Sequence, residues 1–216
     1  MSELIASAAA AYAARHTSPL SDVLSEIAAR TRAGQRSSQM MSGLAEARLL
    51  EALIIVGNAR RVLEIGTFTG VGAVSMAAAL PSDGRVTTLE VDADTAATAR
   101  RNIDDSGYAD RIELIVGDAL QTLERLDGPF DLVYIDAWKN DYPAYYDRVL
   151  PKLAQRGVIV ADNLFRSGKA FDDDADEEST RGIRAFAEQM TDDARVHNVL
   201  LTIGDGVMVI WRHGSR

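Results

Sequence analysis

Hydrophobic residues follow a helical period in the first quarter of the chain. After it, short apolar runs typical of strands alternate with stretches of helical spacing. Three stretches, residues 2–15, about 19–32 and 44–55, are alanine-rich or place apolar side chains at helical spacing. From Arg61 onward, short apolar runs alternate with longer helical patterns. The runs 61–65, 85–89, 111–116, 130–135 and 157–161 predict strands, and the stretches 71–80, 93–106, 119–126, 142–153 and 179–190 predict helices.

This alternation predicts an α/β fold. Strands joined through helices of about ten residues form parallel pairs, so we expect a doubly wound, mostly parallel sheet with helices on both faces. Two further runs, 195–202 and 206–211, flank Gly204-Asp205-Gly206, which favours a hairpin turn. The chain is thus expected to form a seven-stranded sheet with a C-terminal antiparallel hairpin.

We expect one domain over residues 1–216, because a chain of 216 residues is too short for two full domains. Within it, the helices of residues 1–57 cover the functional site or form a dimer contact, and residues 58–216 form the α/β core. A homodimer is the expected assembly.

Composition narrows the function. The chain has no cysteine, which excludes disulfides, thiolate zinc sites and a cysteine nucleophile. Its formal net charge of −9 argues against general binding to a nucleic-acid backbone. Residues 1–14 are apolar, but they lack the basic start of a signal peptide and are too short to span a bilayer. We therefore expect a cytoplasmic protein with no membrane partner.

A glycine-rich turn follows the first strand. In doubly wound sheets, ligands bind beyond the carboxyl ends of the strands. The first strand ends in Glu64-x-Gly66-x-x-x-Gly70-x-Gly72, where glycines let the backbone approach a ligand closely. The spacing differs from the dinucleotide motif, and no Gly-Lys-Ser/Thr of a phosphate-binding loop follows. A carboxylate here would repel a phosphate and favour an ammonium or sulfonium group. A tight turn with purely structural glycines is the alternative.

Acidic residues also follow the second and third strands. Glu90 ends the second strand, where a carboxylate can accept both hydroxyls of a ribose, although a surface acid is the alternative. Asp118-Ala119 follows the third strand and is placed either to line an adenine edge or, through Asp118, to cap the next helix.

The fourth and fifth strands end in Asp136-Ala137-Trp138-Lys139 and Asp162-Asn163. If these strands are neighbours, about 4.8 Å apart, then Asp136, Asp162 and Asn163 converge. Three oxygen donors without sulfur or histidine suit a hard divalent cation such as Mg²⁺. Helix caps or solvated loop acids are the alternative.

These motifs together resemble the cation-dependent O-methyltransferases, which include catechol and caffeoyl-CoA O-methyltransferases. The resemblance extends from about Met40 to the C-terminus, and it rests on the segments 62–67, Glu90, 134–139 and 162–163. It implies a class I, Rossmann-like methyltransferase that uses S-adenosylmethionine and Mg²⁺, or another divalent cation such as Mn²⁺ or Ca²⁺. It also implies a small aromatic substrate with two vicinal oxygens.

The resemblance further implies roles for individual residues. Lys139 would be the general base, and Asp136, Asp162 and Asn163 would bind the metal. The cofactor would be held by Met41, Ser42, Glu64, Gly66, Thr67, Gly72, Glu90, Asp118, Ala119 and Asp136.

Three other functions are weighed against this one. Methyl transfer to a tRNA nucleoside keeps the cofactor, but the acidic charge opposes it. A nicotinamide-dependent oxidoreductase lacks its glycine spacing here. A non-catalytic cofactor-binding protein would not need Lys139 beside three metal-ligating residues.

The run Phe171 to Glu178 is strongly acidic. It lacks the glycine and the distal glutamate of a calcium loop, so we expect a solvated loop on the substrate side that leads into a helix N-terminus. His16, His197 and His213 are assigned no chemistry.

Overall fold

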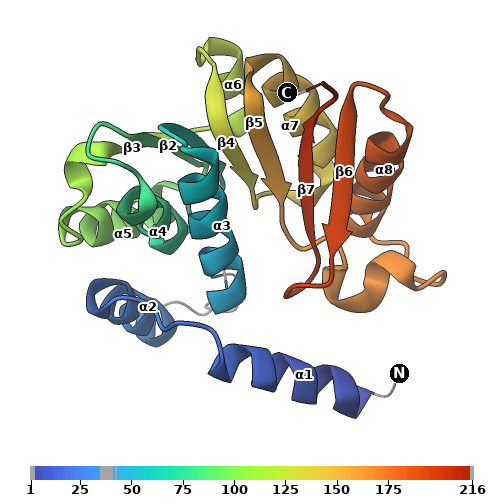
Figure 1. The fold of residues 1–216 in the computed structure, drawn as a ribbon, viewed down its shortest axis with the longest axis horizontal. Helices are drawn as coiled ribbons and strands as arrows, with labels where there is room; N and C mark the ends of the chain where they lie inside the picture. Colours follow the sequence, from blue (N-terminus) through green and yellow to red (C-terminus); the bar gives the residue numbers. More distant parts are fainter. Residues whose placement is uncertain (1–2, 35–40, 42, 215–216) are drawn as a thin grey trace.

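The computed structural model describes residues 3–34, 41 and 43–214, so Ser42, one of the predicted cofactor residues, lies outside the described residues. Seven strands form a single sheet in the order β3-β2-β1-β4-β5-β7-β6 (Figure 1). The first five are parallel, and β7 pairs antiparallel with both β5 and β6. The strands are β1 (Arg61–Ile65), β2 (Arg85–Glu90), β3 (Ile112–Val116), β4 (Phe130–Ile135), β5 (Leu153–Ala161), β6 (Val196–Leu201) and β7 (Val207–Arg212).

Helices cover both faces of this sheet, as the sequence predicts. The α-helices are α1 (Glu3–Arg15), α2 (Asp22–Gly34), α3 (Leu44–Gly57), α4 (Val71–Ala79), α5 (Ala93–Asp104), α6 (Ala119–Arg125), α7 (Tyr142–Val149) and α8 (Glu178–Asp192). Short 3₁₀ segments are η2 (Ala109–Arg111), η3 (Lys139–Asp141), η4 (Leu150–Lys152) and η5 (Arg166–Phe171). Among the helices of the described ranges, none has the length and apolar character needed to cross a membrane.

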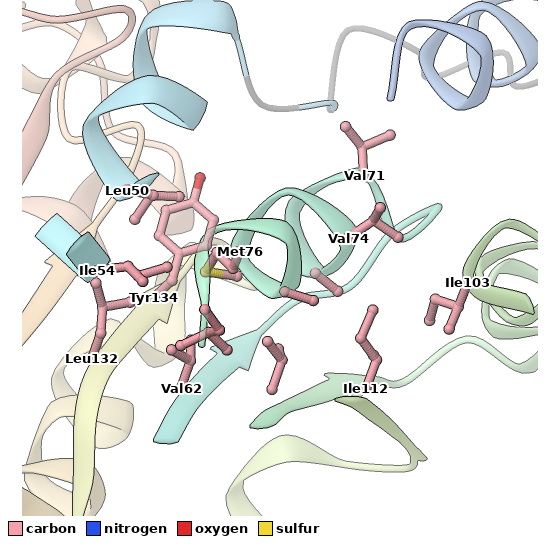
Figure 2. Packing of buried hydrophobic residues seen from close by; sticks show 14 of the residues in the cluster. Leu50, Ile54, Val62, Val71, Val74, Met76, Ile103, Ile112, Leu132 and Tyr134 are labelled. Carbon is pink, nitrogen blue, oxygen red and sulfur yellow. The ribbon is translucent and has the colours of Figure 1, made fainter. Parts of the chain in front are cut away.

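Two hydrophobic clusters fill the space on either side of the sheet. Successive strand residues point to opposite faces, so Val62 packs in one cluster and Leu63 in the other. The first cluster joins the sheet to α2, α3, α4 and α5, and Figure 2 shows Leu50, Ile54 and Met76 close to Tyr134 within it. The second cluster joins the sheet to α6, α7 and α8.

The largest difference from the predicted elements lies between α7 and β5. The sequence suggested a helix over 142–153 and a strand beginning at 157, whereas α7 ends at Val149 and β5 begins at Leu153. Pro151 explains the early end, because proline lacks the amide proton that the helix interior needs. The longer strand carries an irregularity, since Phe130 pairs with Leu153 and Leu132 with Val158.

The order of the strands places the candidate site. The chain runs outward from β1 to β2 and β3, and then returns to place β4 on the other side of β1. This reversal is the switch point at which doubly wound sheets bind ligands. Because β4 and β5 are adjacent and parallel, the acidic residues that follow them lie side by side, as expected.

Candidate active site

A cavity of about 870 Å³ opens beyond the carboxyl ends of the parallel strands. Most of the residues singled out from the sequence line it, whereas Asp162 is buried next to it. The lining residues among the predicted set are Met41, Glu64, Gly66, Thr67, Gly72, Glu90, Asp118, Ala119, Asp136, Lys139 and Asn163.

The glycine-rich turn lets the ends of β1 and β4 approach each other. Gly66 has a φ of +100°, and a Cβ added to it would lie 2.0 Å from the carbonyl oxygen of Asp136. The amides of Gly66 and Thr67 donate to the carbonyl of Leu89 at the end of β2. Because only glycine fits between these strand ends, the first glycine of the motif is required for the shape of the cavity.

Glu64 is a carboxyl group held inside the protein at the end of β1. The hydroxyl of Thr88 on β2 donates to it, and a Cβ on Gly72 would lie 2.2 Å from its Oε1. The pKa of Glu64 is raised from 4.5 to about 8, chiefly by burial and less by the charges of Asp136 and Glu90, while the hydrogen bond from Thr88 opposes the rise. The carboxyl group is therefore mostly protonated near pH 7, and a nearby positive charge would favour its ionised form.

Glu90 and Asp118 both use their carboxylates to hold backbone. Glu90 accepts from the amides of Phe68 (2.8 Å) and Asp92 (3.0 Å), which fixes the glycine-rich turn against the end of β2. Asp118 accepts from the amide of Gln121 at 2.8 Å, so it is the N-cap of α6. It also lines the cavity, so the two interpretations drawn from the sequence are compatible.

Lys139 lies on the other side of the cavity, at the start of η3, four residues after the last residue of β4. Its Nζ donates to Asp136 Oδ1 and to the hydroxyl of Tyr142, both at 2.7 Å. The side chains of Lys139 and Asp136 are only 12% and 17% exposed. The Tyr142 hydroxyl is within hydrogen-bonding distance of the carbonyls of Ile135 (3.1 Å) and Asp162 (3.0 Å), which links the ammonium group to the ends of β4 and β5.

Asp162 is 3% exposed and accepts two hydrogen bonds. The hydroxyl of Tyr134 donates to Oδ2 at 2.8 Å, and the amide of Asn163 donates to Oδ1 at 2.6 Å. Burial, and next the charge of Asp136, raise the pKa of Asp162 from 3.8 to about 6. Asn163 adopts a φ of +60°, a conformation that asparagine tolerates better than most residues.

This second group fits a hard cation by its donor chemistry. Two carboxylates that repel each other lie beside an amide side chain, and a divalent cation would relieve that repulsion. Within the described part of the chain, no three or more His, Cys, Asp or Glu side chains lie close enough together to hold a metal ion. The third candidate ligand is instead the neutral oxygen of Asn163.

Several residues around the cavity escaped the sequence analysis. Tyr134 and Tyr142 hold Asp162 and Lys139, and Ser167 and Asp205 line the cavity. The tyrosines left a weak signal, because a buried tyrosine in an aliphatic stretch needs a partner for its hydroxyl. Asp205 belongs to the β6–β7 turn, and its approach to the cavity depends on tertiary structure alone.

Comparison with known proteins gives consistent results. The family model described as O-methyltransferase matches residues 14–213. A catechol O-methyltransferase from Niastella koreensis is 38% identical over 146 residues, covering 65% of this chain and 66% of that relative. A catechol O-methyltransferase from Mycobacterium tuberculosis is 49% identical over 127 residues, covering 57% of each. Among solved structures, the O-methyltransferase TomG from Streptomyces achromogenes, in complex with SAM, superposes with a TM-score of 0.86 at 30% identity, covering 96% of both chains.

Proposed function

The chain belongs to the O-methyltransferase family, and we propose that it transfers the methyl group of S-adenosylmethionine to a hydroxyl of a small catechol-like aromatic substrate. One observation carries this proposal. A single cavity joins the glycine-rich turn and Glu64 on one side to Asp136, Lys139 and Asn163 on the other.

The donor half of the cavity, at the ends of β1, β2 and β3, would hold S-adenosylmethionine. Its sulfonium and ammonium groups suit Glu64, whose carboxyl would ionise as these charges arrive. Glu90 would accept the ribose hydroxyls, and Asp118 with Ala119 would border the adenine. The methionine end would be held by Met41, Ser42, Glu64, Gly66, Thr67 and Gly72, and Asp136 would approach it from β4.

The acceptor half, at the ends of β4 and β5, would hold the aromatic substrate. Asp136, Asp162 and Asn163 would bind Mg²⁺ or a similar cation such as Mn²⁺ or Ca²⁺. When bound, such a cation lowers the pKa of two vicinal hydroxyls and orients them. A substrate with a single hydroxyl would lack the second oxygen, so the proposal favours catechols over simple phenols.

Lys139 would accept the proton of the reacting hydroxyl as a neutral amine, the form that a divalent cation bound nearby would favour. As the new oxygen–carbon bond forms, the sulfur–carbon bond breaks in line, and the proton passes to Nζ. In that form Nζ would donate its two N–H groups to Asp136 and Tyr142, which leaves its lone pair for the substrate. Holding donor and acceptor together in one cavity adds the benefit of proximity.

A methyl-transfer assay with labelled S-adenosylmethionine tests this proposal. We expect methylation of catechol but not of phenol, loss of activity with a chelator, and recovery with added Mg²⁺. Activity that persists with the chelator would remove the metal from the proposal. Calorimetry that detects no binding of S-adenosylmethionine would overturn the proposal as a whole.

A tRNA nucleoside as the acceptor gains no support from the relatives, and the net charge of −9 opposes it. A homodimer and a cytoplasmic location stay predictions from the sequence.

A further inference from the structure

The loop between β5 and α8, residues 162–177, forms one wall of the acceptor half. Asn163, Arg166 and Ser167 from this loop line the cavity. Three of its non-glycine residues have positive φ angles: Asn163 at +60°, Arg166 at +49° and Ser167 at +55°. Such backbone is unfavourable on its own and persists only where surrounding contacts hold it.

Arg184 on α8 supplies contacts of this kind. Its half-buried guanidinium donates to four backbone carbonyls of the loop. Nε reaches Ala170 and Nη1 reaches Ala175, both at 3.0 Å, while Nη2 reaches Lys169 at 3.0 Å and also Asp172. One cation therefore gathers the carbonyls of a seven-residue stretch, which only a planar group with several donors can do.

The opposite side of the same loop is held by the β6–β7 turn. The amide of Ser167 donates to Asp205 Oδ1 at 2.7 Å, and the amide of Phe165 donates to the Asp205 carbonyl at 2.7 Å. The amides of Gly168 and Ala170 both donate to the Phe165 carbonyl, which closes the short helical turn between these two anchors. The cavity-lining residues Arg166 and Ser167 thus lie between Asp205 and the carbonyls that Arg184 binds.

A second arginine on the same helix offers a contrast. Arg181, one turn earlier, is exposed and contacts Asp176 near the far end of the loop, through both its carboxylate and its carbonyl. Lys169 and Glu177 form another exposed pair. Exposed pairs of this kind contribute little to stability. Arg184 is distinguished by binding four backbone carbonyls of the loop, whereas Arg181 binds one, near the far end.

We propose that Arg184 is a positioning residue for the methyl acceptor. By gathering the carbonyls of residues 169–175, it holds Arg166 and Ser167 in the conformation that forms the acceptor wall. This inference rests on the proposed function for the identity of the acceptor. The proposed role requires the planar guanidinium group and not only a positive charge. A lysine at this position would keep the charge but could not reach four carbonyls at once.

Kinetics of Arg184→Ala, Arg184→Lys and the matched control Arg181→Ala test the inference. For Arg184→Ala we expect KM for catechol to rise about tenfold, the scale of losing hydrogen bonds from a charged donor, with kcat changed less than about threefold. The Kd for S-adenosylmethionine should stay unchanged, because none of the residues predicted to hold the cofactor belongs to this loop. Arg184→Lys should recover little, whereas millimolar guanidinium ion should lower the KM of Arg184→Ala. Arg181→Ala should change KM by less than about twofold.

Hydrogen exchange provides a readout that does not depend on catalysis. The amides of Ser167, Gly168 and Ala170 should exchange faster in Arg184→Ala than in the wild type, while amides in β1 and β2 should not change. Unchanged loop exchange, or an unchanged KM together with faster exchange, would overturn the inference. A loss of cofactor affinity equal to the loss of acceptor affinity would also overturn it, because general unfolding would explain both. Failure of the wild type to methylate catechol would instead refute the proposed function, and the exchange comparison would still test the loop.

Discussion

At the ends of β1 and β2, the wall of the cavity is made of backbone that closely approaches other groups, whereas at the ends of β4 and β5 it is made of side chains that hold one another. In the donor half, a Cβ on Gly66 would lie 2.0 Å from the Asp136 carbonyl oxygen, and one on Gly72 would lie 2.2 Å from Glu64 Oε1. In the acceptor half, Tyr142 holds Lys139 and Tyr134 holds Asp162.

The difference bears on how each half can vary. A wall built from close backbone approach accepts few substitutions, because any added atom must displace a strand end. A wall built from side chains and a loop can change shape through its residues while the sheet stays the same. The donor half therefore suits one invariant ligand, and the acceptor half suits a substrate that differs between relatives.

The largest expected effect separates the chemistry of the acceptor half from binding in the donor half. Lys139→Ala should reduce turnover by roughly 10²–10⁴-fold, the usual scale for general base catalysis. The Kd for S-adenosylmethionine, measured by calorimetry, should stay near the wild-type value. Lys152→Ala is the matched control, because Lys152 donates to the Leu126 carbonyl instead of binding at the cavity. Wild-type turnover in Lys139→Ala would remove this residue from the mechanism.

A second substitution tests whether the two halves depend on one close contact. Gly66→Ala should lower the free energy of unfolding by about 3 kcal/mol or more, since it combines a strained φ with overpacking against Asp136. Denaturant unfolding measures this, and binding of S-adenosylmethionine should weaken as well.

Gly107→Ala is the matched control for Gly66→Ala. Its φ of +79° is similarly unfavourable, but an added Cβ would meet no atom within 4 Å. We expect it to cost only about 1–2 kcal/mol, the backbone strain alone. Equal losses in the two variants would show that the close approach of β1 and β4 has no special importance.

The smallest expected effect is a pH dependence of the free energy of unfolding. The buried carboxyl groups of the two halves contribute to it in different pH ranges. The folded protein keeps Glu64 protonated up to a pKa of about 8, whereas the unfolded chain ionises it near 4.5. The folded state therefore binds more protons in this window, so stability should fall as pH rises, by at most about 1.4 kcal/mol per pH unit. Asp162, with a pKa of about 6, contributes in the same direction but only at lower pH.

Glu64→Gln isolates this contribution. Chemical unfolding of the ligand-free protein at pH 6 and pH 8 should show a smaller decline in the variant than in the wild type. Calorimetry in two buffers should also detect release of a proton when S-adenosylmethionine binds to the wild type near pH 7, and no such release in Glu64→Gln. An identical pH dependence in both proteins would contradict the buried, neutral state of Glu64.

The two halves also differ in how well the sequence predicted them. Close backbone approach requires glycine, so Gly66 and Gly72 were visible as a motif, and the buried strands were visible as apolar runs. Asp136 and the pair Asp162-Asn163 are visible in the sequence because each follows the end of a predicted strand, and the adjacency of β4 and β5 brings these strand ends together.

The acceptor wall could not be predicted in the same way. Arg184 binds carbonyls 9 to 15 residues away, and backbone carbonyls carry no residue-specific signal. Asp205 reaches the loop only because β7 returns to pair with β5. The end of α7 was misplaced for a local reason, since the apolar pattern continued past Pro151 although the helix did not.

The position of β7 has a consequence for the order in which the protein is made. A ribosome delivers the chain from its N-terminus, so β1 to β4 emerge early and can pair while later segments are still being synthesised. β7 emerges after β6, yet it occupies the place between β5 and β6. Until then, β5 has an unpaired edge, and Asp205 is not yet in place to anchor the loop that follows Asp162. A nascent chain can therefore complete the acceptor side of the cavity only after β7 has paired with β5.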